Sequence, residues 1–314
     1  MNNITRTILV CVAALAVLAC SNSKDDQNKA ANDPKAASDN SPAPGASGEP
    51  RLLRVTGIPD ENPTELARKY KPLVDMLEKA LDAEVKYVPV TDYGAAVQAL
   101  VAGKVDVAWL GGFTHVQSRL MTDVVPLAMR DIDRAFHSVF IAHKDSGIGS
   151  PADLKGKTFA FGSKSSTSGH LMPRHFLQTE HTIDPERDFG GPPVFSGAHD
   201  ATAKMVESGQ VQAGALNMQV WDRMVASGSV DTSAVSVIWK TPPYVDYVWT
   251  ARAALTAEMR DAFRRAFLDL DAAKPEHRAI LDLLGAEQKY VPAAASDFDA
   301  IESVARSTGL LKSR

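Results

Sequence analysis

Residues 52–66 decide the fold, and they read LLRVTGIPDENPTEL. The first seven of them, Leu52 to Ile58, form an apolar run that predicts a β-strand. The letters NPTE at 62–65 then supply a helix cap, a first-turn proline and a glutamate in the third position. Apolar side chains continue at helical spacing at Leu66, Tyr70, Leu73, Leu77 and Leu81. This stretch therefore predicts a strand followed directly by an amphipathic helix.

The same alternation of strand and helix continues along the chain. Strands are predicted at 85–90 and 105–109, with a helix at 95–102 between them and another helix after Gly111 and Gly112. A second block from about 147 to 246 repeats the pattern, with strands at 158–161, 213–216 and 236–239 and helices from about 169 and at 200–208. Alternation of this kind predicts an α/β fold of mainly parallel sheets with helices on both faces, in which ligands lie at the carboxyl ends of strands.

Two extended runs bracket the second block. They are residues 138–142, SVFIA, and residues 247–251, YVWTA, after which the chain turns helical again through 255–270. We therefore predict an inserted second lobe that is joined to the first by two crossover strands, which form a hinge around a cleft. Lobe 1 would comprise residues 51–142 and 248–314, and lobe 2 residues 143–247.

The N-terminus reads as an export signal over residues 1–19. Arg6 supplies the positive start, and the apolar run 8–19 is short for a membrane span. The letters VLAC at 17–20 resemble the lipobox of bacterial lipoproteins, which implies that Cys20 is lipidated. The alternative is an ordinary signal peptide with a chance cysteine. Because Cys11 would leave with the signal, the mature chain would hold one cysteine and no internal disulfide.

Residues 21–50 contain no Val, Ile, Leu, Met or aromatic residue and are rich in Ser, Asn, Asp, Ala, Gly and Pro. A segment of that composition cannot build a core, so we expect residues 20–50 to be the lipidated cysteine and a disordered tether. We therefore expect the folded part to lie in the periplasm or at the cell surface, anchored by lipid to a bacterial membrane.

The charge pattern argues against a nucleic-acid partner. The 314-residue chain has a formal net charge of -4, and its Lys and Arg are scattered. The same balance means that an anionic ligand must be held by local hydrogen-bond donors, because the overall field does not attract it.

Four segments supply a resemblance, namely VTDY at 90–93, VDVAWLG at 105–111, SSTSG at 165–169 and SGAH at 196–199, with a weaker fifth, WKTPP at 239–243, that leads to Asp246. Together and in this order they resemble the periplasmic phosphonate, phosphite and hypophosphite binding proteins of ABC importers. The resemblance covers about residues 52–270. It implies the two-lobed periplasmic binding protein fold, with two hinge strands between the lobes. It also implies a monomeric solute-binding protein that works with an ABC permease and needs no cofactor. It also implies an anion site lined by six residues, which are Tyr93, Ser166, Thr167, Ser168, His199 and Asp246.

Two positions depart from the family pattern. Where aminoethylphosphonate binders have a tyrosine, this chain has Phe136 followed by His137, which removes a hydroxyl donor. Where they have a glutamate that meets the ligand amine, this chain reads NMQV at 217–220. An aminophosphonate is therefore disfavoured. Other relatives are described as selenate-binding proteins, which keeps selenate as an alternative ligand.

The chemistry of the six residues is that of an anion site. Pro173 must lie in the first turn of its helix, so the hydroxyls at 166–168 stand at a helix amino end, where free N–H groups and partial positive charge favour anions. Tyr93 and His199 can donate from a phenol and a ring N–H. The alternative interpretations are a plain helix cap, a core tyrosine and a surface histidine.

Asp246 bears most directly on the ligand's chemistry. An ionised carboxylate only accepts hydrogen bonds, so it favours an anion that keeps a proton over selenate or sulfate. The alternative is a hinge carboxylate in a salt bridge. Trp109, Phe113 and Phe136 are candidates for apolar walls of the cleft, although core packing is the favoured role for each of them. His137 is a fourth wall candidate.

Two rival functions stay open. A Ser-His-Asp hydrolase would use the serines, His199 and Asp246, but the chain has no G-x-S-x-G turn. We expect no enzyme activity, and no metal site, because His170 and His175 lie five residues apart without a metal-binding motif. A ligand-binding partner of a sensor kinase would have the same fold, and residues of this chain do not distinguish it.

Overall fold

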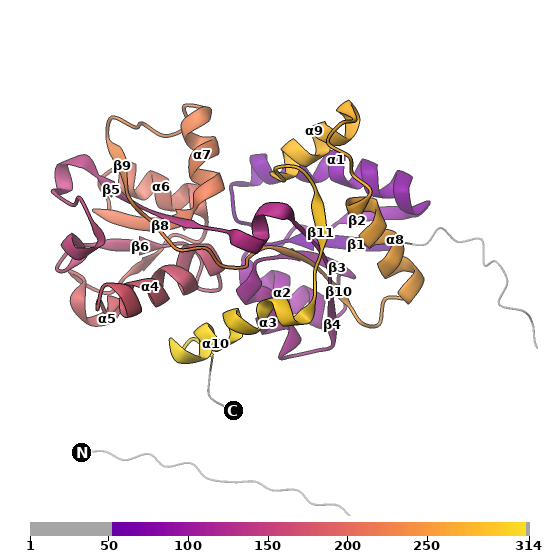
Figure 1. Cartoon of the computed structure of the whole chain (residues 1–314), viewed down its shortest axis with the longest axis horizontal. Helices are drawn as coiled ribbons and strands as arrows, with labels where there is room; N and C mark the ends of the chain where they lie inside the picture. Colours follow the sequence, from indigo (N-terminus) through magenta and orange to yellow (C-terminus); the bar gives the residue numbers. More distant parts are fainter. Residues whose placement is uncertain (1–51, 312–314) are drawn as a thin grey trace, which may run out of the picture. The chain divides into compact units, whose positions relative to one another are not determined.

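The computed structural model describes residues 52–311, so the predicted signal peptide, Cys20 and the tether lie outside the described residues. The described strands form two sheets (Figure 1). The first sheet has the order β11-β4-β10-β3-β1-β2 and the second the order β7-β6-β8-β5-β9. The strands are β1 (Leu52–Gly57), β2 (Glu84–Tyr87), β3 (Val107–Leu110), β4 (Val124–Arg130), β5 (Ser138–His143), β6 (Phe159–Phe161), β7 (Val194–Phe195), β8 (Ala213–Asn217), β9 (Val235–Lys240), β10 (Val248–Arg252) and β11 (Tyr290–Pro292).

The predicted fold class is confirmed, with one strand in each sheet reversed relative to its parallel neighbours and β11 reversed as well. In the first sheet β2 and β3 run parallel to β1, whereas β10 runs antiparallel to both β3 and β4. In the second sheet β7 and β8 run parallel to β6, and β5 runs antiparallel to β8 and β9. The reversed strands β5 and β10 are the two extended runs that the sequence suggested as crossovers.

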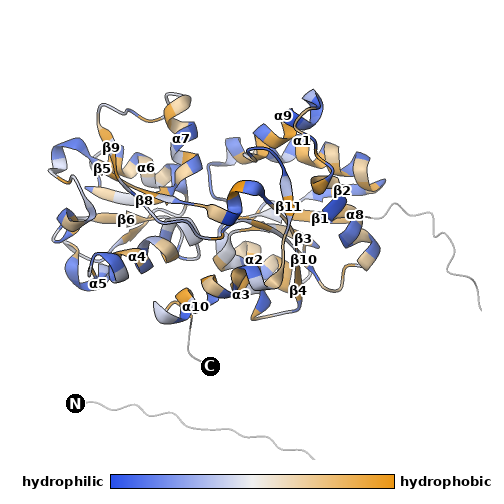
Figure 2. Cartoon of the chain, viewed as in Figure 1, coloured by the Kyte–Doolittle hydropathy of each residue, from blue (hydrophilic) through white to orange (hydrophobic). Residues whose placement is uncertain are grey.

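The helices cover both faces of each sheet. They are α1 (Pro63–Leu81), α2 (Tyr93–Val101), α3 (Gly112–Arg119), α4 (Met172–Glu180), α5 (Pro185–Asp188), α6 (His199–Glu207), α7 (Met218–Ala226), α8 (Ala257–Leu268), α9 (Pro275–Leu284) and α10 (Asp299–Ser307). Four apolar clusters result, one on each face of each sheet. Figure 2 shows this as apolar strands between helices whose outer faces are hydrophilic. No helix in the described part of the chain is long and apolar enough to cross a membrane.

Helix α1 forms as its sequence predicts. The Asn62 side chain accepts hydrogen bonds from the backbone N–H groups of Thr64 and Glu65, which satisfies two free donors of the first turn. The helix then buries its apolar stripe, which consists of Leu66, Tyr70, Leu73 and Leu77. Burying such leucines contributes roughly 2 kcal/mol each, so the stripe and not the cap fixes the helix against the sheet.

The segments that join the two sheets differ from the predicted ones. The predicted boundary after Ala142 falls inside β5, and all of β5 pairs with β8 and β9 of the second sheet. The connecting segments are instead residues 131–137 and 241–247. They run antiparallel and pair through Phe136 and Tyr244, whose backbone groups exchange hydrogen bonds of 2.8 and 3.0 Å. We call the part containing the first sheet lobe 1 and the part containing the second sheet lobe 2.

Candidate functional site

Four helical segments begin where strands end, and their first turns meet between the lobes. From lobe 1 come α2, which begins at Tyr93, and α3, which begins at Gly112. From lobe 2 come the π-helical turn η4 (Thr167–Leu171) and α6, which begins at His199. First turns carry unpaired N–H groups and partial positive charge. The arrangement therefore provides anion-binding groups from both lobes.

His199 lies fully buried in this region with a defined tautomer. Its Nδ1 accepts a hydrogen bond of 3.3 Å from the backbone N–H of Asn217. Burial lowers the pKa of His199 to about 3, so the ring is neutral and carries its proton on Nε2. This Nε2 lies 3.4 Å from the hydroxyl oxygens of both Tyr93 and Tyr247. Both contacts are long, so the N–H remains available to a ligand oxygen.

Ser166, which caps η4, and Thr167, its first residue, use their side-chain oxygens as acceptors within the protein. Ser166 Oγ accepts from Gly169 N–H over 2.9 Å, and Thr167 Oγ1 accepts from Phe113 N–H of lobe 1 over 3.0 Å. All three side chains of 166–168 are buried. Because the Ser166 and Thr167 oxygens accept from N–H groups, each of these two hydroxyls keeps an O–H proton that it can donate. Proline 173 lies in the first turn of α4, as predicted.

Asp246 stands opposite these hydroxyls with one oxygen satisfied. Its Oδ1 accepts from Gly112 N–H over 3.0 Å, whereas Oδ2 is buried and forms no hydrogen bond in the described part of the chain. Burial raises the pKa of Asp246 to about 7, and the charge of Asp133 raises it further, against the lowering effects of nearby Thr167 and Ser168 and of Gly112 N–H. The Thr167 and Ser168 hydroxyls are thus near enough to stabilise the charged form of Asp246, although neither forms a hydrogen bond of ordinary geometry with Oδ2.

Two glycines allow the lobes and turns to approach this closely. A Cβ at Gly111 would stand 3.0 Å from Thr167 Oγ1 and 3.2 Å from Asp246 Oδ1. A Cβ at Gly169 would stand 3.0 Å from both His199 Cε1 and Ser166 Oγ. Both glycines therefore border the six residues that the sequence singled out, and side chains at these positions would crowd them.

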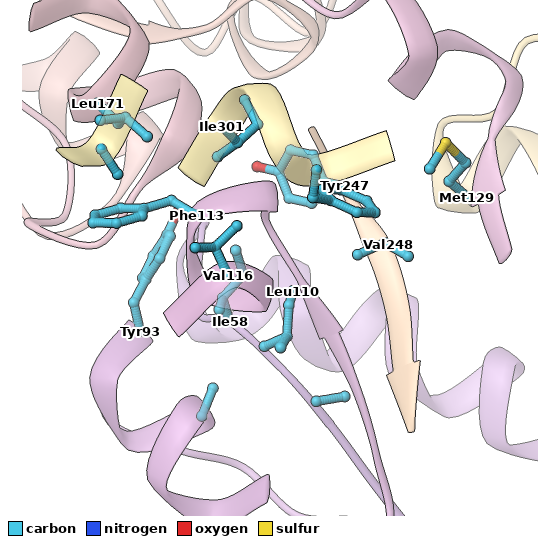
Figure 3. Close-up of a cluster of buried hydrophobic side chains, with 14 of the residues drawn as sticks. Ile58, Tyr93, Leu110, Phe113, Val116, Met129, Leu171, Tyr247, Val248 and Ile301 are labelled. Atoms are coloured by element: carbon cyan, nitrogen blue, oxygen red, sulfur yellow. The ribbon is translucent and has the colours of Figure 1, made fainter. Parts of the chain in front are cut away.

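The structure brings the six predicted ligand-binding residues together. The predicted wall residues have different contacts from one another. Phe113 packs with Tyr93 and Leu171 in the apolar cluster drawn in Figure 3. Phe136 is buried edge-on against Tyr247. Trp109 stacks on Tyr247, with the ring centroids 5.6 Å apart.

His137 belongs to the hinge. Its Nδ1 contacts the carbonyl oxygen of Thr241 at 2.8 Å, which joins the two connecting segments. Core packing, the alternative to a wall position, therefore describes Phe113 well. His137 instead joins the two connecting segments, a role that was not predicted.

Sequence reasoning missed three buried residues that hold the site in shape. The Tyr247 hydroxyl donates to Asp60 Oδ2 over 3.0 Å and accepts from Asn217 Nδ2 over 3.0 Å. Asp60 also accepts His199 N–H at its backbone oxygen over 3.0 Å. The signals were present, since Tyr247 follows Asp246 directly and Asp60 lies between the first strand and its helix. Neither position has a pattern that tells a buried polar residue from a surface one.

The hydrogen-bond partners argue against a serine hydrolase. In the described part of the chain, His199 bonds to Asn217 and contacts two tyrosines, and none of its hydrogen bonds goes to a serine or to Asp246. A triad needs the histidine between nucleophile and carboxylate. Asp246 Oδ2 is instead a buried acceptor without a partner among the described residues, near the hydroxyls of Thr167 and Ser168, which suits binding of an oxyanion that carries a proton.

A groove of about 1850 Å³ lies between the lobes. It is lined by α1 and the loop 89–92 of lobe 1, and by Ser163, Ala198 and residues of α6 and α7 of lobe 2. Asp92 and Ala198 directly precede Tyr93 and His199. None of the six predicted site residues itself lines the groove.

Comparison with known proteins bears on the same residues. Residues 55–298 match the family described as "ABC transporter, phosphonate, periplasmic substrate-binding protein". The "Probable ABC transporter phosphite binding protein PhnD1" of Prochlorococcus marinus strain MIT 9301 is 37% identical over 274 residues, covering 84% of this chain and 92% of the relative. The structure of PhnD1 from that organism in complex with methylphosphonate has a TM-score of 0.79 and 36% identity, covering 84% of this chain and all of that one.

A third relative carries a different ligand in its name. The "Phosphate-import protein PhnD" of Mycolicibacterium smegmatis is 29% identical over 321 residues, covering 96% of this chain and 95% of the relative. The family match spans both lobes and all six predicted site residues. The chain therefore belongs to the phosphonate family of periplasmic substrate-binding proteins of ABC transporters.

Proposed function

We propose that this substrate-binding protein captures a small phosphorus oxyanion that keeps one proton, such as phosphite or methylphosphonate, for import through an ABC permease. The site would be formed by Tyr93, Ser166, Thr167, Ser168, His199 and Asp246. The observation that carries the proposal is the free Oδ2 of Asp246 among buried donors. The names of the Prochlorococcus relative and structure support the same ligand class.

The donors supply binding without a paired cation. The Tyr93 phenol, the hydroxyls of 166–168 and the neutral Nε2–H of His199 each offer one hydrogen bond to an oxyanion. Hydrogen bonds to a charged acceptor contribute about 1.5–3 kcal/mol each, and more donors come from first-turn N–H groups. A few such bonds are enough for micromolar binding after the cost of association is met.

Asp246 would then select ligands by their protonation state. Its Oδ2 can accept from an acidic P–OH, or it can hold the shared proton itself and donate to a dianion. In either case protein and ligand together hold one proton between two oxygens. Sulfate and selenate bring no proton at neutral pH, so their binding requires a protonated Asp246.

An aminophosphonate fits the site poorly. The side chain of Asn217 donates to Tyr247 and caps α7, and Gln219 bonds to Arg130 and to the Gly285 carbonyl. Neither residue offers a carboxylate to a ligand ammonium. Phe136 offers no hydroxyl either, and its ring faces the Arg130 guanidinium at 5.8 Å.

The proposed role of the whole chain combines a lipid anchor at Cys20 with a folded part that binds the ligand. We propose that lipid on Cys20 anchors the chain to a bacterial membrane on the periplasmic or outer side, that the folded part acts as a monomer, and that it binds its ligand without converting it. Cell fractionation of a Cys20→Ser variant tests the anchor, since retention of that variant in the membrane would contradict it.

A thermal-shift panel tests the ligand class. The ligands are phosphite, hypophosphite, methylphosphonate, phosphate, 2-aminoethylphosphonate, selenate and sulfate, each at equal concentration and pH 7. A ligand that binds only the folded state raises the melting temperature. The proposal expects the largest increases for phosphite and methylphosphonate and little for the aminophosphonate. A larger increase for selenate or sulfate than for every phosphorus anion would contradict it.

A further inference from the structure

Glu61 lies at the contact between the lobes, outside the proposed anion site. It follows Asp60 in the loop between β1 and α1, and 6% of its side chain is exposed. It forms one ion pair with Lys69 of α1, which belongs to the same lobe. It forms a second with Arg223 of α7 in the other lobe, at 2.8 Å. One buried carboxylate is therefore shared by a cation from each lobe.

The shared carboxylate is strongly held in its charged form. Burial by itself would raise the pKa of Glu61, but Lys69 and Arg223 outweigh it and lower the pKa to about 2. A buried carboxylate that loses every partner is costly, whereas one that keeps a partner is not. Separation of the lobes would remove Arg223 and leave Lys69 in place, because Lys69 lies eight residues along the same lobe.

Arg223 is suited to leave the contact. About 36% of its side chain is already exposed, against 16% for Lys69, so opening would return a half-hydrated guanidinium to water. The pair can therefore break and re-form without leaving an uncompensated charge in either state.

Further bonds between the lobes surround this pair. The Asn62 backbone N–H and side-chain amide both donate to Asp200 Oδ2 over 2.9 Å, which ties the start of α1 to the start of α6. Arg130 of lobe 1 donates to Gln219 Oε1 of lobe 2 over 2.8 Å. A cavity of about 40 Å³ beside them is lined by Lys69, Arg130, Gln219 and Arg223, among others. Its size and polarity suit buried water.

We propose that the Glu61–Arg223 pair, with Lys69 as the resident partner of Glu61, is a reversible latch that holds the lobes together and slows release of the ligand. The part of this proposal that concerns ligand release rests on the proposed function. The part that concerns the closed lobes does not. Since neither residue belongs to the proposed anion site, the latch would change dissociation more than recognition.

The test compares Arg223→Met with wild type in the full chain carrying Cys11→Ser and Cys20→Ser. Spin labels at Lys71 of α1 and Ser229 after α7, both exposed, report the distance between the lobes. Arg223→Met keeps the apolar stem and leaves Glu61 paired with Lys69, so the variant is expected to fold. We expect longer label distances without ligand, and phosphite dissociation about tenfold faster with association little changed. Arg223→Lys should restore much of the wild-type behaviour.

Arg68→Met is the matched control, because Arg68 pairs with Glu65 inside α1 and joins no second lobe. Unchanged label distances in Arg223→Met, or unchanged dissociation of a ligand that wild type binds, would overturn the latch. The same changes in Arg68→Met would also overturn it, since they would show a general effect of lost charge. If wild type binds none of the oxyanions, the proposed function fails, and the label distances without ligand still decide the latch.

Discussion

Asn217 donates its backbone N–H to Nδ1 of His199 over 3.3 Å, and this bond places the proton of the neutral ring on Nε2. The bond comes from lobe 2 alone, so the ring is oriented before any ligand arrives. The Nε2–H then points at two tyrosine hydroxyls that lie too far away to hold it strongly.

The first prediction concerns that tautomer. Nitrogen-15 spectra of ring-labelled protein without ligand should show His199 as the neutral Nε2–H form throughout pH 5 to 8. The reason is the pKa of about 3, which places the ring's titration below this window. Because the unfolded ring binds a proton below about 6.5 and the folded ring does not, His199 should destabilise the fold as pH falls. Titration of His199 near 6.5, or an Nδ1–H tautomer, would contradict the assignment.

Tyr93→Phe should weaken phosphite binding by about tenfold, the typical cost of one hydrogen bond to a charged acceptor. The melting temperature should change little, because the contact of the hydroxyl with His199 Nε2 is long, at 3.4 Å. Isothermal titration checks the affinity. Tyr87→Phe is the control, as Tyr87 stacks on Tyr70 away from the site. Equal losses in the two variants would count against a role for Tyr93 in binding.

Gly111→Ala should damage both the contact between lobes and the site. Its methyl group would lie 3.0 Å from Thr167 Oγ1 and 3.2 Å from Asp246 Oδ1, so one of these groups must move. We expect at least a tenfold loss of phosphite affinity from displaced donors, together with a lower melting temperature. Gly149→Ala is the control, because its Cβ meets only Asp153 Oδ2 at 3.9 Å. Wild-type affinity in Gly111→Ala would show that the site tolerates the shift.

The pKa of Asp246 predicts how stability depends on pH. The carboxyl titrates near 3.8 when unfolded and near 7 when folded, so the folded protein keeps a proton that the unfolded chain loses between these values. The contribution of the Asp246 carboxyl to the free energy of unfolding is therefore fully present below about pH 4, and it is lost as the pH rises to 7. Asp246→Asn should be more stable than wild type at pH 8 without ligand. Its free energy of unfolding should be higher by at most about 4 kcal/mol, and its melting temperature should be higher too. The difference should shrink toward pH 4. A difference that grows toward low pH would contradict the raised pKa.

The sequence predicted the α/β architecture and the first helix well, because both follow from local patterns. The NPTE cap and the leucine stripe of α1 are examples, and each acts within a few turns of chain. The two crossover strands were predicted at 138–142 and 247–251, and in the structure these runs pair within the second and the first sheet as β5 and β10. Which sheet each strand joins depends on distant partners, such as β8 for Ser138 and β3 for Val248.

In the site, too, the features that depend on local sequence were predicted, and those that depend on distant partners were not. Six side chains were predicted together through a resemblance, and local chemistry explained why each suits an anion. The bonds that orient them, from Asn217 to His199 and from Asp60 to Tyr247, join residues far apart in the sequence. So does the ion pair between Glu61 and Arg223. Spacing along the chain holds no signal for such pairs, which is why they emerge only from the fold.

The central claim is that Asp246 and the ligand share one proton, and calorimetric titration tests it most directly. Wild type and Asp246→Asn are each titrated with phosphite and selenate at pH 8, in two buffers of different ionisation enthalpy, so that proton uptake is measured with affinity. We predict that wild type prefers phosphite and takes up a proton on binding it. The variant should lose that uptake and bind phosphite about 10- to 100-fold more weakly, while selenate loses less or gains. Tight selenate binding by wild type, with phosphite rejected and selenate weakened by the substitution, would contradict the account.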